Sequence, residues 1–334
     1  MNTAVWSILH FLVDFVCACA MYAFFCDGSY ESLLIYNFCA FALQLPLGTL
    51  LDLCKGRYRR MPTFCATLGA GMTLLGVILH PAILGLGNAL FHVGAGIDVL
   101  EIDRAKGLKG CGLGVFVAPG AIGLYLGAML GIRTGHPAVF VTVCLLMLVL
   151  LAWKWRNGST CQSSASHGST HWGKLLTVAI CCFVVVIIRS YVGLAVSFPW
   201  KSLPLLGAFG VLGATCGKMC GGFLAAKFGL CRTVVATLLL ASVLYAFGAV
   251  PICGLIGIFL FNMSMPLTLC LLAEQLPQLP GFSFGLLTFG LFLGFLPVYW
   301  QAELPIGPSY VGAIGSLISC VLLFMAGKAA KHHA

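Results

Sequence analysis

KWRNGSTCQSSASHGSTHWGK, residues 154–174, is the longest polar stretch of this chain and lies close to its centre. On both sides of it, apolar runs of about twenty residues follow one another, separated by short polar breaks. A Ser- and Gly-rich composition of this kind is typical of a flexible tether. The stretch therefore predicts two apolar bundles of similar length that are joined by a linker.

The composition places both bundles in a membrane. Of 334 residues, 60% are hydrophobic and only 8% are charged, and the mean hydropathy is +1.05. These values exclude a soluble domain of average composition. A bilayer admits helices or closed barrels, and the apolar runs lack the two-residue alternation of barrel strands. We therefore predict an all-α, multi-pass integral membrane protein, with the first apolar run retained because it has no cleavage site.

The apolar runs predict twelve transmembrane helices in two six-helix bundles. The N-terminal bundle covers 1–155, the cytoplasmic linker 156–171 and the C-terminal bundle 172–334. Prolines mark many of the breaks between runs. The expected spans are 3–26, 31–53, 62–80, 81–102, 109–132, 136–153, 172–198, 204–226, 231–250, 251–273, 280–301 and 307–327.

The basic residues predict the orientation. With the N-terminus inside, fourteen Lys and Arg residues fall in cytoplasmic connections, and only Arg133 and Lys201 fall on the opposite face. Both termini are therefore expected in the cytoplasm, in a bacterial inner membrane or a plasma membrane. Because topology explains the net charge of +9, we expect the lipid bilayer as partner and no nucleic acid.

Cysteine and histidine usage predicts no cofactor. Most of the seventeen cysteines lie inside apolar runs, where a thiol behaves as a small hydrophobe. In the linker, Cys161, His167 and His171 match no closed zinc site. We interpret these residues as packing groups and linker residues.

The two halves resemble each other at an offset of about 170 residues, which indicates a duplicated six-helix unit. GTLLDLCKGRYRR (48–60) follows the second span, and GFLAAKFGLCR (222–232) follows the eighth. Phe91-His92 in the fourth span corresponds to Phe261-Asn262 in the tenth. Both signature segments combine glycines with basic residues after a helix.

This organisation resembles the major facilitator superfamily. HFLVD (10–14), GLGNALFHVGAG (85–96) and VFVAPGAIG (115–123) are similar to the fosmidomycin-resistance type of exporter. Val93 and Gly94 stand where that type usually has a proline and an acid, so its drug substrates are not implied. The resemblance implies alternating access around a central cavity lined by spans one, four, seven and ten.

Polar side chains within the spans are the candidate substrate and proton site. An ionisable group in hydrocarbon costs about 3 kcal/mol, so each one needs a role. His10 and Asp14 are four residues apart and share a helix face, which makes Asp14 a candidate proton carrier. The candidates are His10, Asp14, Gln44, Asn88, His92, Arg189, Lys218 and Asn262, and the resemblance places all but Gln44 and Lys218 on cavity-lining spans.

Arg189 stays charged at physiological pH and would attract an anionic substrate group. The alternative is a salt bridge between Arg189 and Asp14 that only joins the two halves.

Charged residues near the cytoplasmic ends of the spans are the candidate gate. We expect salt bridges there that close the inner face of the transporter. The candidates are Asp52, Arg57, Arg60, Asp98, Glu101 and Arg104. The glycine-rich segment 112–131 is interpreted as close helix packing, because no strand precedes it as in a phosphate-binding loop.

The sequence favours a secondary active transporter of a small organic solute, coupled to protons through Asp14 and the histidines. The alternative is a divalent transition-metal transporter with His10, Asp14 and His92 as ligands. The chain has no nucleophile, base and acid set and no phosphate-binding loop, so we expect no enzyme. The transporter is expected to act as a monomer.

Overall fold

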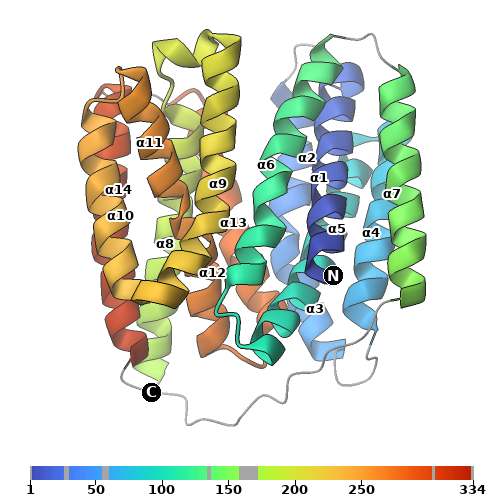
Figure 1. The fold of residues 1–334 in the computed structure, drawn as a ribbon. Helices are drawn as coiled ribbons and strands as arrows, with labels where there is room; N and C mark the ends of the chain where they lie inside the picture. The colour runs from blue at the N-terminus through green and yellow to red at the C-terminus, as the bar shows by residue number, and fades with distance from the viewer. Residues whose placement is uncertain are drawn as a thin grey trace. The chain divides into compact units, whose positions relative to one another are not determined.

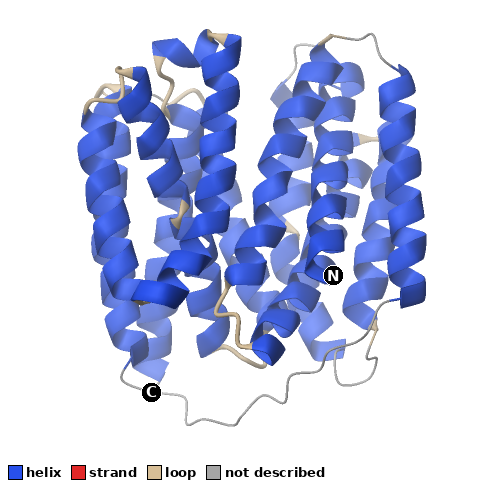
Figure 2. Ribbon diagram, in the orientation of Figure 1, coloured by secondary structure: helices blue, strands red, loops and turns tan. Residues whose placement is uncertain are grey.

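The computed structural model describes residues 2–25, 30–54, 60–133, 137–157, 172–302 and 305–331. These residues are helical almost throughout, and none of them lies in a strand (Figure 2). Eleven helical segments among them are long and apolar enough to cross a membrane, and a shorter apolar helix covers Leu230–Ala246. The predicted all-α membrane fold with twelve spans is confirmed.

The chain forms two compact units. Unit 1 comprises Met1–Lys106, Val115–Ser163 and Gln278–Phe289, and unit 2 comprises Gly107–Gly114, Ser164–Pro277 and Gly290–Ala334. Helices α6 and α13 therefore contribute residues to both units. The bundle limits drawn from the sequence remain a prediction, and the units differ from them at 107–114 and 278–289.

The elements from α1 to α7, drawn in blue to green in Figure 1, belong to unit 1 except for residues 107–114. Two spans contain a short π-helical segment, η1 at the end of the first span and η2 between α2 and α3. The elements are α1 (Asn2–Ala20), η1 (Met21–Phe25), α2 (Tyr30–Asn37), η2 (Phe38–Ala42), α3 (Gln44–Cys54), α4 (Met61–Leu79), α5 (Pro81–Lys106), α6 (Cys111–Ile132) and α7 (Pro137–Asn157).

Glycines bring helices α1 and α6 of unit 1 into backbone contact. A Cβ on Gly123 would meet the carbonyl oxygen of Phe11, and a Cβ on Gly127 would meet that of Phe15. Small residues at such spacing allow close approach of membrane helices. The packing interpretation of segment 112–131 is confirmed for this part of α6.

The elements from α8 to α14 belong to unit 2 except for residues 278–289. Proline is the first residue of several helices, a position where its missing N–H costs nothing. The elements are α8 (Trp172–Ala195), η3 (Pro199–Ser202), α9 (Pro204–Phe228), α10 (Leu230–Ala246), α11 (Pro251–Asn262), α12 (Ser264–Gln275), α13 (Pro280–Tyr299) and α14 (Pro308–Lys331).

The tenth span is broken, whereas the sequence prediction made it continuous over 251–273. Helix α11 ends at Asn262, Met263 forms a turn and α12 begins at Ser264. Pro266 has no backbone N–H, so the carbonyl of Asn262 receives no bond from the residue four positions later. The break therefore follows from the proline inside the apolar run.

Candidate functional site

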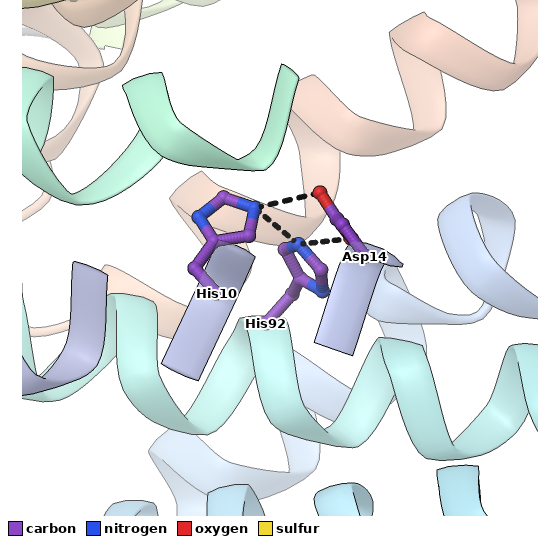
Figure 3. A group of neighbouring side chains, drawn as sticks. All are labelled: His10, Asp14 and His92. Carbon is purple, nitrogen blue, oxygen red and sulfur yellow. Dashed lines mark hydrogen bonds and ion pairs between the residues drawn. The ribbon is translucent and has the colours of Figure 1, made fainter. Parts of the chain in front are cut away.

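Three ionisable side chains meet inside unit 1, and we call His10, Asp14 and His92 the trio (Figure 3). The Nε2 atoms of His10 and His92 are 2.8 Å apart. His10 Nε2 is 3.1 Å from Asp14 Oδ2, and His92 Nε2 is 3.6 Å from Asp14 Oδ1. The three residues are between 5% and 9% exposed, so the cluster is shielded from water.

Helices α1 and α5 supply the trio. His10 and Asp14 are one turn apart on α1, and His92 comes from α5, which packs against α1. The imidazole rings of His10 and His92 are perpendicular, with centroids 4.4 Å apart. The rings of Phe116 and Phe91 lie 4.8 Å and 6.4 Å from that of His10. These aromatic neighbours make the surroundings of the polar cluster apolar.

The hydrogen bonds of the outer ring nitrogens define the tautomers. His10 Nδ1 is 2.8 Å from the carbonyl oxygen of Phe116, and His92 Nδ1 is 2.9 Å from that of Asn88. A carbonyl oxygen can only accept, so both Nδ1 atoms carry hydrogen and donate it. Each Nε2 of a neutral ring then presents a lone pair.

Two facing lone pairs 2.8 Å apart, next to a carboxylate, repel one another. A positive charge between these atoms, either a proton that makes one ring an imidazolium or a bound cation, would relieve this repulsion. With one such proton, the imidazolium balances the charge of Asp14. The geometry of the trio is therefore suited to a bound proton or another cation.

Asn88 holds the carboxylate of Asp14. Its Nδ2 donates to Asp14 Oδ1 at 3.2 Å and approaches the Cys17 sulfur at 3.5 Å. Its buried Oδ1 has no hydrogen-bond partner among the described residues. Asn88 thus fixes the orientation of Asp14 and leaves one acceptor at the site without a donor.

Gly120 provides the space beside the trio. A Cβ at this position of α6 would collide with Asp14 Oδ2 and His10 Nε2. Pro119, the residue before it, cannot donate to the carbonyl of Val115 in the preceding turn. The proline-glycine element thus allows α6 to approach α1 at the level of the trio, where His10 reaches the Phe116 carbonyl.

Substitution of Gly120 by alanine is expected to lower the free energy of unfolding by about 1–3 kcal/mol, the usual cost of overpacking. The new methyl group would push Asp14 or His10 out of the trio. Thermal unfolding of the purified protein measures the change. Gly71→Ala is the matched control, because nothing lies within 4 Å of a Cβ at that helical position. Equal midpoints for the two variants would show that α6 does not confine the trio.

The other predicted substrate residues are distributed over both units. Gln44 lies in unit 1 and is fully buried, but its Nε2 donates to the Ala40 carbonyl of the same span at 2.6 Å. Arg189, Lys218 and Asn262 lie in unit 2, on α8, α9 and α11. Within unit 1, the structure therefore brings together His10, Asp14, His92 and Asn88, and the described hydrogen bonds do not join Gln44 to them.

Asp98, a predicted gate residue, forms a buried ion pair inside unit 1. Its Oδ2 accepts from Lys154 Nζ at 3.1 Å and from Trp6 Nε1 at 2.6 Å. Lys154 is fully buried, and its Nζ lies 4.7 Å from the centre of the Trp6 ring. The sequence prediction ended the sixth span at 153 and placed Lys154 in a cytoplasmic connection, but α7 continues to Asn157. The gate role of Asp98 remains a prediction.

The remaining gate candidates lie near helix ends in unit 1. Arg57 lies outside the described residues. Arg60 is exposed before the start of α4, Glu101 is buried and Arg104 is half-buried near the end of α5. Their predicted role in closing the inner face is not tested by these positions.

Asp52, also a gate candidate, caps the start of α13 within unit 1. Its Oδ1 accepts from the Gly281 N–H at 2.9 Å, and its Oδ2 accepts from the Phe282 N–H at 2.7 Å. A carboxylate at this position satisfies free backbone donors and interacts favourably with the helix dipole. Gly48 on α3 and Gly281 on α13 are also in backbone contact.

Substitution of Asp52 by alanine is expected to lower the free energy of unfolding by about 1–2 kcal/mol, the usual cost of losing a helix cap. Asp52→Asn, which keeps one acceptor oxygen, should lose about half as much. The midpoints of thermal unfolding in detergent provide the comparison. An alanine variant as stable as the wild type would mean that the cap contributes no stability.

Comparison with known proteins adds the fold to this geometry. The transporter FucP of the major facilitator superfamily, in its outward conformation, is 14% identical with a TM-score of 0.67 and 98% coverage of both chains. The E. coli fucose:proton symporter FucP gives 13% identity and a TM-score of 0.67, with 98% of this chain and 96% of that chain covered.

The human organic anion transporter MFSD10 gives 14% identity and a TM-score of 0.67, with 97% of this chain and 99% of that chain covered. Comparison of the sequence with protein-family models and with curated proteins gives no match. At these identities the likeness establishes the major facilitator fold over nearly the whole chain. The resemblance to the fosmidomycin-resistance type remains a prediction.

Proposed function

We propose that this chain is a secondary active transporter that moves a small organic solute together with a proton held by the trio. The observation that carries the proposal is the arrangement of His10 and His92, whose outer nitrogens both donate to carbonyls while their inner nitrogens face each other at 2.8 Å. The major facilitator fold and the proton symport named for FucP support it. We propose no enzymatic activity.

Charge explains how the trio couples proton binding to conformation. Loss of the proton in the observed geometry would leave a buried carboxylate next to two facing lone pairs. Such a state costs several kcal/mol in apolar surroundings. The proton can therefore leave only when the trio rearranges or reaches water. Alternating access between two sides of the membrane provides that change.

A two-stage experiment tests the proposed function. Thermal stabilisation of the purified protein by organic anions, organic cations and metal ions identifies ligands. Each ligand found is then labelled, and its uptake is measured in proteoliposomes with an imposed pH gradient. Uptake that follows the gradient supports proton-coupled transport. Flux that is indifferent to the gradient contradicts it.

A divalent transition metal is the second candidate for the transported solute. The ligand atoms of His10, Asp14 and His92 lie within 4.8 Å of one another. Imidazoles whose second nitrogen donates to a carbonyl are usual in such sites. Stabilisation by a metal ion that is lost in His92→Asn but kept in His80→Asn, a change at an exposed histidine, would favour this candidate. Absence of stabilisation by Mn²⁺, Co²⁺ and Zn²⁺ would exclude it.

The proposed transporter has the membrane orientation and the monomeric state that we expect from the sequence. The distribution of basic residues supports cytoplasmic termini, and we propose that the transporter acts as a monomer. Accessibility of engineered cysteines to an impermeant reagent in intact cells tests the orientation.

A further inference from the structure

Arg189 is a buried cation of unit 2 for which the described residues provide no ion-pair partner. Arg189 on α8 is 8% exposed, and its Nε has no hydrogen-bond partner among the described residues. None of the ion pairs found among these residues involves it. Lys154 of unit 1 shows the contrast, because that buried cation is paired with Asp98. The unfavourable free energy of burying the Arg189 charge is therefore not offset by an ion pair among the described residues, and its burial needs another explanation.

The packing of α8 fixes the direction of Arg189. The neighbouring position Ser190 donates through its hydroxyl to the Leu291 carbonyl of α13 at 2.7 Å. On the next face, Ile188 and Val192 contact Gly315 of α14. Successive residues of a helix are rotated by about 100°. Arg189 therefore lies on the side of α8 that is turned away from α13, next to the face that contacts α14.

The side of α8 that carries Arg189 is apolar. Val185, Val186 and Val192, which flank Arg189 on the helix, are all buried. These side chains cannot accept a hydrogen bond from a guanidinium. The side chains that flank Arg189 on α8 therefore leave its charge uncompensated, which favours neutralisation by a bound ion.

A second unpaired polar group lies on α14. Ser319 is fully buried, and its hydroxyl oxygen has no hydrogen-bond partner among the described residues. Ser319 is one turn from Gly315, so it is on the face of α14 that packs on α8. Arg189 Nε and Ser319 Oγ, both without a partner in the part of the chain that the structure describes, therefore lie on two helices of unit 2 that are in contact.

We propose that unit 2 binds the carboxylate of an organic anion through the guanidinium of Arg189, with the hydroxyl of Ser319 as a further donor. The planar guanidinium matches the two oxygens of a carboxylate. A single negative charge balances a single positive charge, whereas a dianion would leave an excess charge in the apolar surroundings. This inference rests on the proposed function, because it identifies the solute class that the transporter carries.

The proposal gives a reason for symport. A proton neutralises the charge of the trio in unit 1, and a carboxylate neutralises Arg189 in unit 2. The trio and Arg189 are both without net charge only when the carrier has bound the proton and the carboxylate together. The loaded carrier is thus the form that changes conformation at the lowest electrostatic cost.

Thermal unfolding of the purified full-length protein in detergent tests the carboxylate site. The probes are acetate, lactate and benzoate, each compared with its amide, which has the same shape without the charge. We expect stabilisation by at least one carboxylate and none by the corresponding amide. Stabilisation by no carboxylate, or equally by the amide, would overturn the proposal.

Variants separate binding from structure. Arg189→Met should raise the unfolding midpoint without ligand, because it removes an uncompensated charge, and should weaken carboxylate binding about 100-fold. Ser319→Ala should weaken binding about tenfold. Arg232→Met, at an exposed position of α10, is the control and should keep full binding. A lower midpoint without ligand in Arg189→Met would show that Arg189 has a structural partner and would contradict the proposal.

The outcomes are independent of proton coupling. Binding that depends on Arg189, together with flux indifferent to a pH gradient, would leave the anion site intact and remove the proposed symport. Gradient-driven flux of a solute whose binding is unaffected by Arg189→Met would leave the proposed symport intact and remove the anion site.

Discussion

Replacement of Lys154 by methionine is expected to lower the free energy of unfolding by about 3–5 kcal/mol, the range for breaking a buried ion pair. The variant leaves Asp98 buried and charged. Of the two observed partners of its carboxylate, Lys154 Nζ is lost and Trp6 Nε1 remains. Lys154 also lies over the Trp6 ring, so a contact between α7 and α1 is lost as well. Thermal unfolding and chemical denaturation of the purified protein measure the loss.

A double variant tests whether charge is the cause. Lys154→Met combined with Asp98→Asn removes both charges, and the asparagine oxygen can still accept from Trp6. We expect most of the lost stability to return, because replacing both partners of a buried pair is often close to neutral. Lys106→Met, at an exposed residue of α5, should change stability by less than about 0.5 kcal/mol. A Lys154 variant no less stable than this control would rule out a stabilising pair.

Replacement of Asp14 by asparagine is expected to abolish solute accumulation driven by a pH gradient. Asparagine has nearly the same shape but no charge, so the trio no longer needs a proton to balance it. A gradient of one pH unit stores about 1.36 kcal/mol per proton, which corresponds to about tenfold accumulation for one proton per solute. The wild type should approach that ratio, and Asp14→Asn should stay near unity.

Proteoliposomes with the membrane potential clamped at zero provide the assay for Asp14. Glu31→Gln, a change at an exposed carboxylate of α2, is the control and should accumulate solute like the wild type. Downhill flux without a gradient should persist in Asp14→Asn if the solute site is intact. Wild-type accumulation by Asp14→Asn would assign the coupling proton to another group.

The apolar runs and prolines were sufficient to predict the spans, because the bilayer leaves a long apolar segment few alternatives to a helix. The same reasoning missed the break at Met263, since Pro266 lies inside a run whose hydropathy is high throughout. Lys154 was misplaced for a related reason. It follows an apolar run directly, and its burial depends on Trp6 and Asp98, which come from other helices.

The candidate site was partly visible in the sequence. His10 and Asp14 could be joined by helical spacing alone, and His92 only through the resemblance to known transporters. The roles of the Phe116 carbonyl and of Gly120 depend on how α6 lies against α1, which no local pattern encodes. Predictions from sequence therefore identified the charged groups but not the backbone atoms that set their tautomers.

Nitrogen NMR of the purified protein labelled with ¹⁵N-histidine tests most directly whether the trio carries a proton. Signals of His10 and His92 are assigned with single histidine variants and followed between about pH 8 and 5, the range in which histidine changes charge. We predict that both Nδ1 atoms stay protonated throughout and that the Nε2 pair shares one exchangeable proton, which is lost when the trio opens. Nε2 atoms that remain unprotonated across the whole range would contradict the account.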